Sequence, residues 1–276
     1  MEELLVIDHM TREMKKTAAT LSTAEARYLV RSYYQMQANR VVSGNQESAL
    51  DRSEDSEEEI PQQRHVILSW LTVQNTLLEK QIKSVLGKWA NADPVGVWAQ
   101  SIVGIGPVIS AGLLAHIDIN KAPTVGHIWR YAGLDPTSKW NKGEKRPWNA
   151  DLKTLCWKIG ESFMKFYNHK DDIYGKVYIT RKLQEEDKNN QKLFADQAKE
   201  KLERFRIDPK TAAYKCYIDG RLPPAHINER AKRYAVKLFL SHFHHVLFVA
   251  EFKKDPPRPY IIEHGGHVNF IKPPNF

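Results

Sequence analysis

The chain has 276 residues, of which 42% are hydrophobic, and its formal net charge is +8. This apolar fraction supports a packed core, and the two cysteines, Cys156 and Cys216, exclude a disulfide scaffold and cannot form a zinc ribbon by themselves. Because no apolar run could span a membrane and the acidic N-terminus does not resemble a signal peptide, we expect a soluble, cytoplasmic protein without membrane contact.

Charge is unevenly distributed along the chain. Residues 1–60 hold seven Lys or Arg against twelve Asp or Glu, whereas residues 61–276 hold 34 against 21. Residues 1–46 are predicted to be a helical segment, with a helix over 22–42 that begins at Ser22 or Thr23. Residues 47–60 are predicted to be an acidic linker, and the alternative is a segment that competes with nucleic acid for the basic surface.

A long amphipathic helix is predicted over residues 61–92, beginning at Pro61. Apolar side chains recur there at three- and four-residue steps, from Ile67 and Leu71 to Leu78, Ile82 and Val85. Such a near-heptad stripe either packs on the body of the protein or pairs with another helix. A homo-oligomer assembled through a coiled coil of residues 61–90 is therefore one prediction.

Residues 93–170 begin with a predicted helix, tight turn and helix over 94–117. Gly104, Ile105 and Gly106 form the turn, and Pro107 starts the second helix. Two glycines at this spacing are typical of a helix-hairpin-helix, in which backbone N–H groups at the positive end of the second helix bind phosphate. The alternative is a turn that serves only close packing.

A basic, aromatic loop is predicted between helices at 124–133 and 151–167. Its cations attract phosphates and its exposed indoles can stack on unpaired bases. Alternatively, both tryptophans pin the loop to the core. The candidate DNA-binding residues of this region are Lys139, Trp140, Lys142, Lys145, Arg146, Trp148 and Lys153.

Residues 171–222 are predicted to be a helical insertion, with a polar helix over 175–204 and a short one over 211–217. Residues 223–276 hold a long helix over 225–250 and a small β-hairpin around Gly265 and Gly266. On the long helix, Arg230, Arg233 and Lys237 form a basic stripe, which is either a phosphate contact or an ordinary solvated face. The predicted fold class is mainly α, with a helix-hairpin-helix, a long coiled-coil-like helix and this C-terminal hairpin.

Two further groups have metal-binding or thiol chemistry. His242 and His245 share a helix face and could ligate a metal with a distant third residue, but packing or capping is the commoner role. We therefore predict no metal site. Cys156, beside Trp157 on an apolar helix face, is expected to be buried and inert.

The order of these motifs resembles a known family. Gly104-Ile105-Gly106-Pro107, then Leu113-Leu114-Ala115-His116-Ile117, then Tyr131-Ala132-Gly133-Leu134-Asp135-Pro136 and a basic loop are similar to the C-terminal domain of the IS116/IS110/IS902 transposases. The resemblance is good over residues 65–170 and extends to 225–250. It implies a DNA recombinase with an N-terminal RuvC-like domain and a serine nucleophile after the third motif.

Both catalytic parts of that family depart from the pattern in this chain. The residues before the long helix lack the strand–helix alternation of a RuvC-like domain, whose carboxylates would bind Mg²⁺. The expected serine position reads Asn141-Lys142-Gly143, which leaves Ser138 as the one nearby catalytic candidate. Its base candidates, Asp135 and His127, have no motif support, so no cofactor is expected unless the chain is catalytic with Mg²⁺.

Three functions follow from these observations. The first is a transposase-derived DNA-binding protein of a mobile element or phage, catalytically inactive alone and located in the cytoplasm of a bacterial or phage-infected cell. The second is a recombinase that uses Ser138 with a partner nuclease domain. The third is an RNA-binding or protein-interaction module, because relatives in the family act with a guide RNA.

Overall fold

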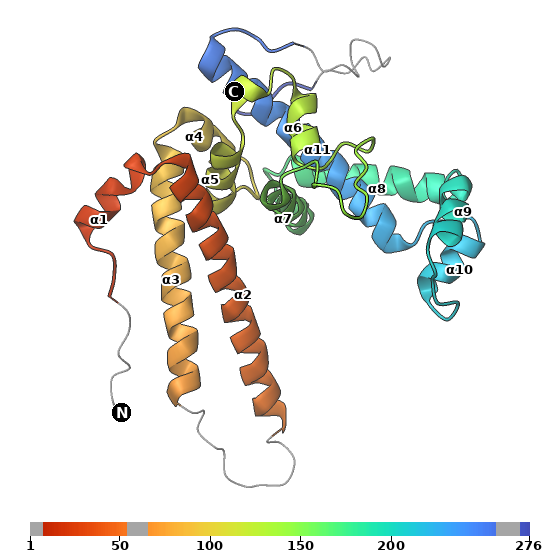
Figure 1. Ribbon diagram of the computed structural model, residues 1–276, viewed down its shortest axis with the longest axis horizontal. Helices are drawn as coiled ribbons and strands as arrows, with labels where there is room; N and C mark the ends of the chain where they lie inside the picture. Colours follow the sequence, from red (N-terminus) through yellow and green to blue (C-terminus); the bar gives the residue numbers. More distant parts are fainter. Residues whose placement is uncertain (1–7, 54–65, 258–270) are drawn as a thin grey trace. The chain divides into compact units, whose positions relative to one another are not determined.

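The computed structural model describes residues 8–53, 66–257 and 271–276, and every regular element within these ranges is helical (Figure 1). The predicted mainly α class is confirmed there, whereas the predicted C-terminal hairpin falls largely outside these ranges. None of the helices in the described ranges is both long and apolar enough to cross a membrane. The helices are α1 (Arg12–Lys16), α2 (Thr23–Ser53), α3 (Val66–Asn91), α4 (Pro94–Gln100), α5 (Pro107–His116), α6 (Val125–Tyr131), α7 (Ala150–Phe166), α8 (Tyr174–Asn190), α9 (Ala195–Arg204), α10 (Ala212–Ile218) and α11 (Pro224–Phe252), with short 3₁₀ helices at Thr17–Thr20 and Ile119–Lys121.

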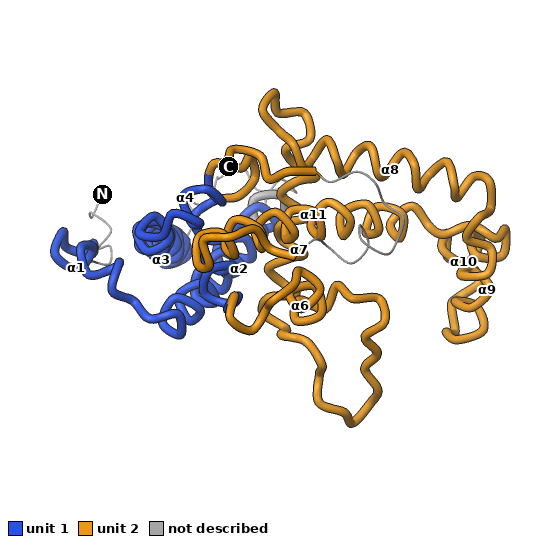
Figure 2. Tube along the Cα trace, turned by 90° about the horizontal axis from the view of Figure 1, so that it is seen from above, with its two compact units in different colours: residues 1–100, 106–118 blue, residues 101–105, 119–276 orange. Residues whose placement is uncertain are grey.

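The contacts divide the chain into two compact units (Figure 2). Unit 1 contains residues 1–100 and 106–118, and unit 2 contains residues 101–105 and 119–276. Each unit has its own hydrophobic core, and each is described separately below.

Unit 1 is built on an antiparallel pair of long helices, α2 and α3. Ser22 and Glu25 form a capping box at the start of α2, with a bond of 2.7 Å from the Ser22 backbone N–H to the Glu25 carboxylate. Along the pair, Arg40 of α2 bonds Glu79 of α3 at 2.6 Å, and Thr72 of α3 bonds Glu47 of α2 at 2.5 Å. α2 ends at Ser53, so the first residues of the predicted acidic linker are helical.

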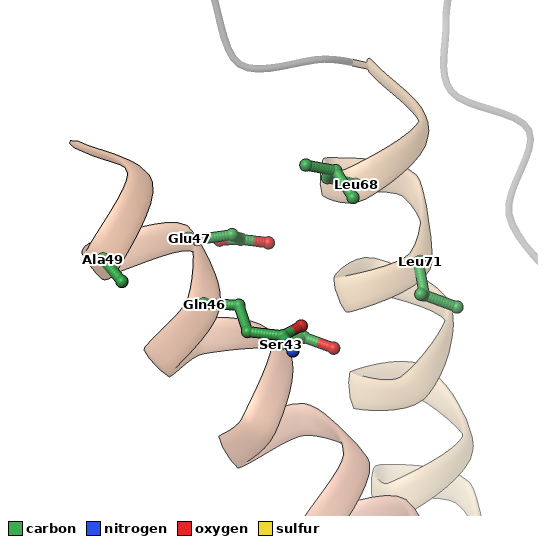
Figure 3. A pocket seen from close by; sticks show the side chains of 6 residues that line it. All are labelled: Ser43, Gln46, Glu47, Ala49, Leu68 and Leu71. Atoms are coloured by element: carbon green, nitrogen blue, oxygen red, sulfur yellow. The ribbon is translucent and has the colours of Figure 1, made fainter. Parts of the chain in front are cut away.

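The predicted apolar stripe of α3 is buried in its C-terminal half and exposed in its N-terminal half. Its C-terminal half packs inside unit 1, where Ile82 and Leu86 join side chains of α2 and α5 in one cluster. Its N-terminal half leaves Ile67, Leu68 and Leu71 exposed. A hollow of about 420 Å³ lies at this end of the pair. Figure 3 shows the side chains that line it, which are Ser43, Gln46, Glu47, Ala49, Leu68 and Leu71.

Unit 2 has an aromatic core where α7, α8 and α11 meet. Phe163 of α7 stacks on Tyr174 of α8 with 4.9 Å between ring centres, and Phe239 of α11 meets both rings edge-on. Cys156 is buried, as predicted, and burial raises the pKa of its thiol to about 12, which disfavours the reactive thiolate.

The polar helix predicted over 175–204 is two helices, α8 and α9. α8 ends at Asn190, and Lys192 adopts a left-handed conformation with φ of 58°. Asn189 fixes the helix end by exchanging two hydrogen bonds with the backbone of Leu222, at 2.9 and 2.8 Å. The chain can then turn back, and α9 packs against α10 (Figure 1).

Candidate nucleic-acid interface

The predicted helix, turn and helix over 94–117 are present as α4 and α5. Gly104 in the turn has φ of +91°, a conformation that favours glycine, and Gly106 is the N-cap residue of α5 without a side-chain cap. Pro107 occupies the first turn of α5, as predicted. The first N–H groups of such a helix lack intrahelical partners, which is the feature that phosphate-binding turns use.

The turn is fixed to α7 within unit 2. The Ser162 hydroxyl donates a 2.6 Å hydrogen bond to the carbonyl of Gly104, and a Cβ on Gly104 would lie 3.1 Å from that hydroxyl. Ile105 is the one turn residue with a side chain, and this side chain is buried in the protein. The Ile105 N–H donates a 2.9 Å hydrogen bond to the Ile102 carbonyl, so the Gly106 N–H is the candidate donor of this turn for a phosphate contact.

The loop between α6 and α7 is closed by Trp148. Its indole packs against Gly133, which has φ of +66°, and Asn149 donates a backbone hydrogen bond of 2.9 Å to Tyr131. Lys153, in the first turns of α7, places its ammonium group 4.1 Å from the centre of the Trp148 ring. Trp148 therefore pins the loop, as the packing alternative predicts.

Trp140 behaves differently, because 46% of it remains exposed. Its Nε1–H donates a 2.8 Å bond to the Glu144 carbonyl, which fixes the position of the ring in the loop. The Arg146 guanidinium lies over the ring at 4.7 Å, and the Trp148 ring centre lies 6.1 Å away. Trp140 is thus an oriented and accessible aromatic surface flanked by a cation.

Arg146, Lys153 and Arg233 form a cluster of exposed cations from the loop, α7 and α11. Partial burial and then the charges of Arg146 and Arg233 lower the pKa of Lys153. Among the described residues, no carboxylate forms an ion pair with these three, and nearby Glu229 pairs with Lys232 instead. Like charges gathered in this way favour binding of an anion, which would relieve their repulsion.

The remaining loop lysines, Lys139, Lys142 and Lys145, are exposed. They lie before and after Trp140 in the sequence, in the irregular segment between α6 and α7. Their charges add to the positive charge of the loop that also holds Arg146.

The predicted basic stripe on α11 is divided by the structure. Arg230 bonds the carboxylate of Glu185 at 2.5 Å and lies over the Phe194 ring at 4.5 Å, so it links α11 to α8 and the start of α9. Lys237 lies over Trp129 at 4.2 Å, and burial lowers its pKa. Arg233 is the exposed member of the stripe and belongs to the cluster described above.

Ser138 has a weak hydrogen bond to a carboxylate, with 3.4 Å between its hydroxyl and Asp135 Oδ2. The backbone N–H and then the hydroxyl of Thr137 bond Asp135 and lower its pKa, which makes Asp135 a poor proton acceptor. His127 is bonded to Thr124 at 2.9 Å. No cluster of three or more His, Cys, Asp or Glu side chains suited to a metal occurs in the described part of the chain.

The α11 histidines make structural bonds. The Tyr174 hydroxyl donates to His242 Nδ1 at 2.6 Å, and His242 Nε2 donates to the Ile271 carbonyl at 2.8 Å. Both ring nitrogens of His242 are therefore engaged, and burial lowers its pKa to about 4. His244 bonds the Ala122 carbonyl at 2.9 Å.

One exposed aromatic residue near the cluster was not singled out from the sequence. Trp157 is 53% exposed on α7, although its neighbour Cys156 is buried. Its spacing of four residues from Lys153 places both on one helix face, and this spacing is the signal that could have identified it.

Comparison with known proteins supports the resemblance seen in the motifs. Searches of curated proteins and of solved structures give no significant match. Residues 98–146, from Trp98 of α4 to Arg146 of the loop, match the model of a family described as Transposase IS116/IS110/IS902. Over this segment the chain is similar to the IS116/IS110/IS902 transposases.

Proposed function

We propose that this chain is a transposase-derived DNA-binding protein of a mobile element or phage, and that it is catalytically inactive alone. The observation that carries this proposal is the cation cluster of Arg146, Lys153 and Arg233 beside the exposed ring of Trp140. Cations without carboxylate partners next to an accessible aromatic ring suit a phosphate backbone with nearby bases.

The residues divide into contacts and supports. Arg146, Lys153 and Arg233 contact phosphates, and the exposed lysines of the loop add attraction that depends on salt. Of the three turn residues, Gly106 offers a further phosphate contact through its backbone N–H at the start of α5. Trp148, Arg230 and Lys237, which pack within unit 2, support the surface by holding the loop and α11 in place.

The geometry around Ser138 favours binding over catalysis by this chain. A nucleophilic serine needs an adjacent base, and the hydrogen bonds to Asp135 weaken the one carboxylate bonded to it. A recombinase that uses Ser138 would then depend on a group from a partner domain, such as metal-bound carboxylates.

The exposed end of α3 supports the proposed homo-oligomer. Ile67, Leu68 and Leu71 continue the apolar stripe that Ile82 and Leu86 bury inside unit 1. Pairing of two copies through these residues would remove the exposed part of the stripe from water.

The decisive experiment is sequencing of nucleic acid that co-purifies with the protein after nuclease protection, which separates DNA, RNA and neither. Fluorescence anisotropy then measures affinity for DNA against salt. Replacing Lys142, Lys145 and Arg146 with alanine is expected to weaken binding and to reduce the salt slope by about two to three units.

A matched control removes the same charge elsewhere. Lys80, Lys83 and Lys88 are exposed lysines of α3, and their alanine variants are expected to retain the affinity and the slope. Equal losses in both triple variants would show that only net charge matters, and unchanged binding of the loop variant would overturn the assignment of the loop.

A further inference from the structure

Besides Trp129, which Lys237 covers, three tryptophans of unit 2 have a cation over the ring and occur close together in the chain. Arg146 lies over Trp140 at 4.7 Å, Lys153 over Trp148 at 4.1 Å, and Lys232 over Trp157 at 5.7 Å. We call Trp140, Trp148 and Trp157 the tryptophan row. Trp148 is the packed member, whereas Trp140 and Trp157 remain about half exposed.

The row is spatially continuous. The ring centres of Trp140 and Trp148 are 6.1 Å apart, and Lys153 connects Trp148 to α7. Trp157 follows Lys153 by one helical turn, so the Cβ atoms of these two residues are about 5–6 Å apart on the same face. An extended ligand could therefore contact Trp140, Lys153 and Trp157 in succession.

The charge beside the row is positive. Among the described residues, Arg146, Lys153 and Arg233 form no ion pair with a carboxylate, and the nearby Glu229 acts on Arg233 only at longer range. The carboxylates of Glu161 and Glu229, which lie near Trp157, are both paired with Lys232. A ligand at this surface meets flat aromatic rings with cations between them. Because Lys232 neutralises Glu161 and Glu229, these two carboxylates repel a negatively charged ligand only weakly.

We infer that this surface binds a single-stranded segment of nucleic acid, with bases stacked on Trp140 and Trp157 and phosphates at Arg146, Lys153 and Arg233. This inference rests on the proposed nucleic-acid binding and adds the strandedness of the ligand and a binding residue, Trp157. In a duplex the base faces are already stacked on one another, so a duplex could use the cations but not the rings. Unpaired bases can use both, and the ring contacts tolerate any base sequence.

Anisotropy with three labelled probes tests the inference: fifteen-residue oligo(dT), fifteen-residue oligo(rU) and a fifteen-base-pair DNA duplex. The full chain is expected to bind at least one single strand more tightly than the duplex. Trp157→Ala is expected to weaken single-strand binding by about 5- to 100-fold and duplex binding by less than about twofold. Its salt slope should not change, because no charge is removed.

Two variants guard against a general loss of structure. Trp157→Phe keeps an aromatic ring and is expected to retain most of the affinity that Trp157→Ala loses. Thermal unfolding of both Trp157 variants, followed by circular dichroism, checks that they are folded. Tyr28→Ala removes an exposed aromatic residue of α2 in unit 1 and is expected to bind all probes as the unchanged chain does.

The outcomes separate this inference from the proposed function. Tight duplex binding that is unaffected by Trp157→Ala, with no preference for either single strand, would overturn the inference and leave the proposed function standing. Equal losses for single strands and duplex would also overturn it. Failure to bind any probe would overturn both, and the choice between oligo(dT) and oligo(rU) identifies the sugar.

Discussion

Trp148 packs so closely against Gly133 that a methyl group on the glycine would approach the indole Cγ to 2.8 Å. The same added carbon would lie 3.0 Å from the Lys153 side chain. Gly133 ends the turn after α6, whereas Trp148 and Lys153 belong to the other end of the loop and the start of α7. One glycine thus allows the closure that orients the candidate binding loop.

Gly133→Ala is expected to destabilise unit 2 by about 2–3 kcal/mol. About 1 kcal/mol comes from the left-handed backbone at φ of +66°, and the rest comes from displacement of the indole. Nucleic-acid affinity should fall as well, because Trp148 and Lys153 both shift. Urea unfolding measures the first effect and anisotropy the second.

Gly143→Ala provides the matched control for this prediction. Gly143 also has a positive φ, of +90°, but no atom lies within 4 Å of its added carbon. This variant should lose about 1 kcal/mol or less, from backbone strain alone. Equal destabilisation by the two variants would show that the contact between Gly133 and Trp148 carries no energy.

Arg230→Ala is expected to lower stability but not nucleic-acid binding, whereas Arg233→Ala is expected to weaken binding but not stability. Arg230 bonds Glu185, whose side chain is 1% exposed, so its removal leaves a buried carboxylate with Arg181 as its remaining ion-pair partner. We expect a loss of about 2–4 kcal/mol in the free energy of unfolding. Arg233 is exposed, so its removal should cost little stability.

In nucleic-acid binding, Arg233→Ala is expected to have the larger effect of the two variants. Arg233→Ala is expected to lower the salt slope by about one unit, as removal of one phosphate contact does. Arg230→Ala, measured well below its unfolding temperature, should retain the slope. A full slope in Arg233→Ala would remove this residue from the proposed interface.

These arginines show what the sequence can and cannot predict. Spacing places Arg230, Arg233 and Lys237 on one helix stripe, and helix signals such as Pro107 and Ser22 locate the starts of α5 and α2 within a residue. Spacing does not reveal that Glu185, far away in sequence, lies beside Arg230. Likewise, no glycine or proline marks the break at Lys192, because the tertiary contact of Asn189 with Leu222 determines it.

Oligomer formation through α3 is expected to depend on its exposed end. Leu71→Asp places a charge on the exposed part of the stripe and should convert an oligomer into a monomer without loss of helix content, measured by light scattering and circular dichroism. Leu86→Asp places the charge in the core of unit 1 and should unfold that unit instead. A chain that is already monomeric, and whose mass Leu71→Asp does not alter, would refute pairing through this surface.

Mild acid is expected to destabilise unit 2 through His242. Its folded pKa of about 4 lies below the ordinary value of 6.5, because burial opposes the charged form. Between these two values the unfolded chain binds more protons than the folded one, so the free energy of unfolding falls as pH decreases from about 6.5 to 4. The contribution of this one residue at pH 5 is on the order of 2 kcal/mol.

His242→Gln separates this effect from the general acid response. Glutamine stays neutral and can still bond Tyr174 or the Ile271 carbonyl, so the variant should be less stable at pH 7 but should vary less between pH 6.5 and 4. His244, whose pKa burial also lowers, would retain its own contribution of the same sign. Urea unfolding at half-unit pH steps measures both curves, and parallel curves would mean that burial does not hold His242 neutral in the folded protein.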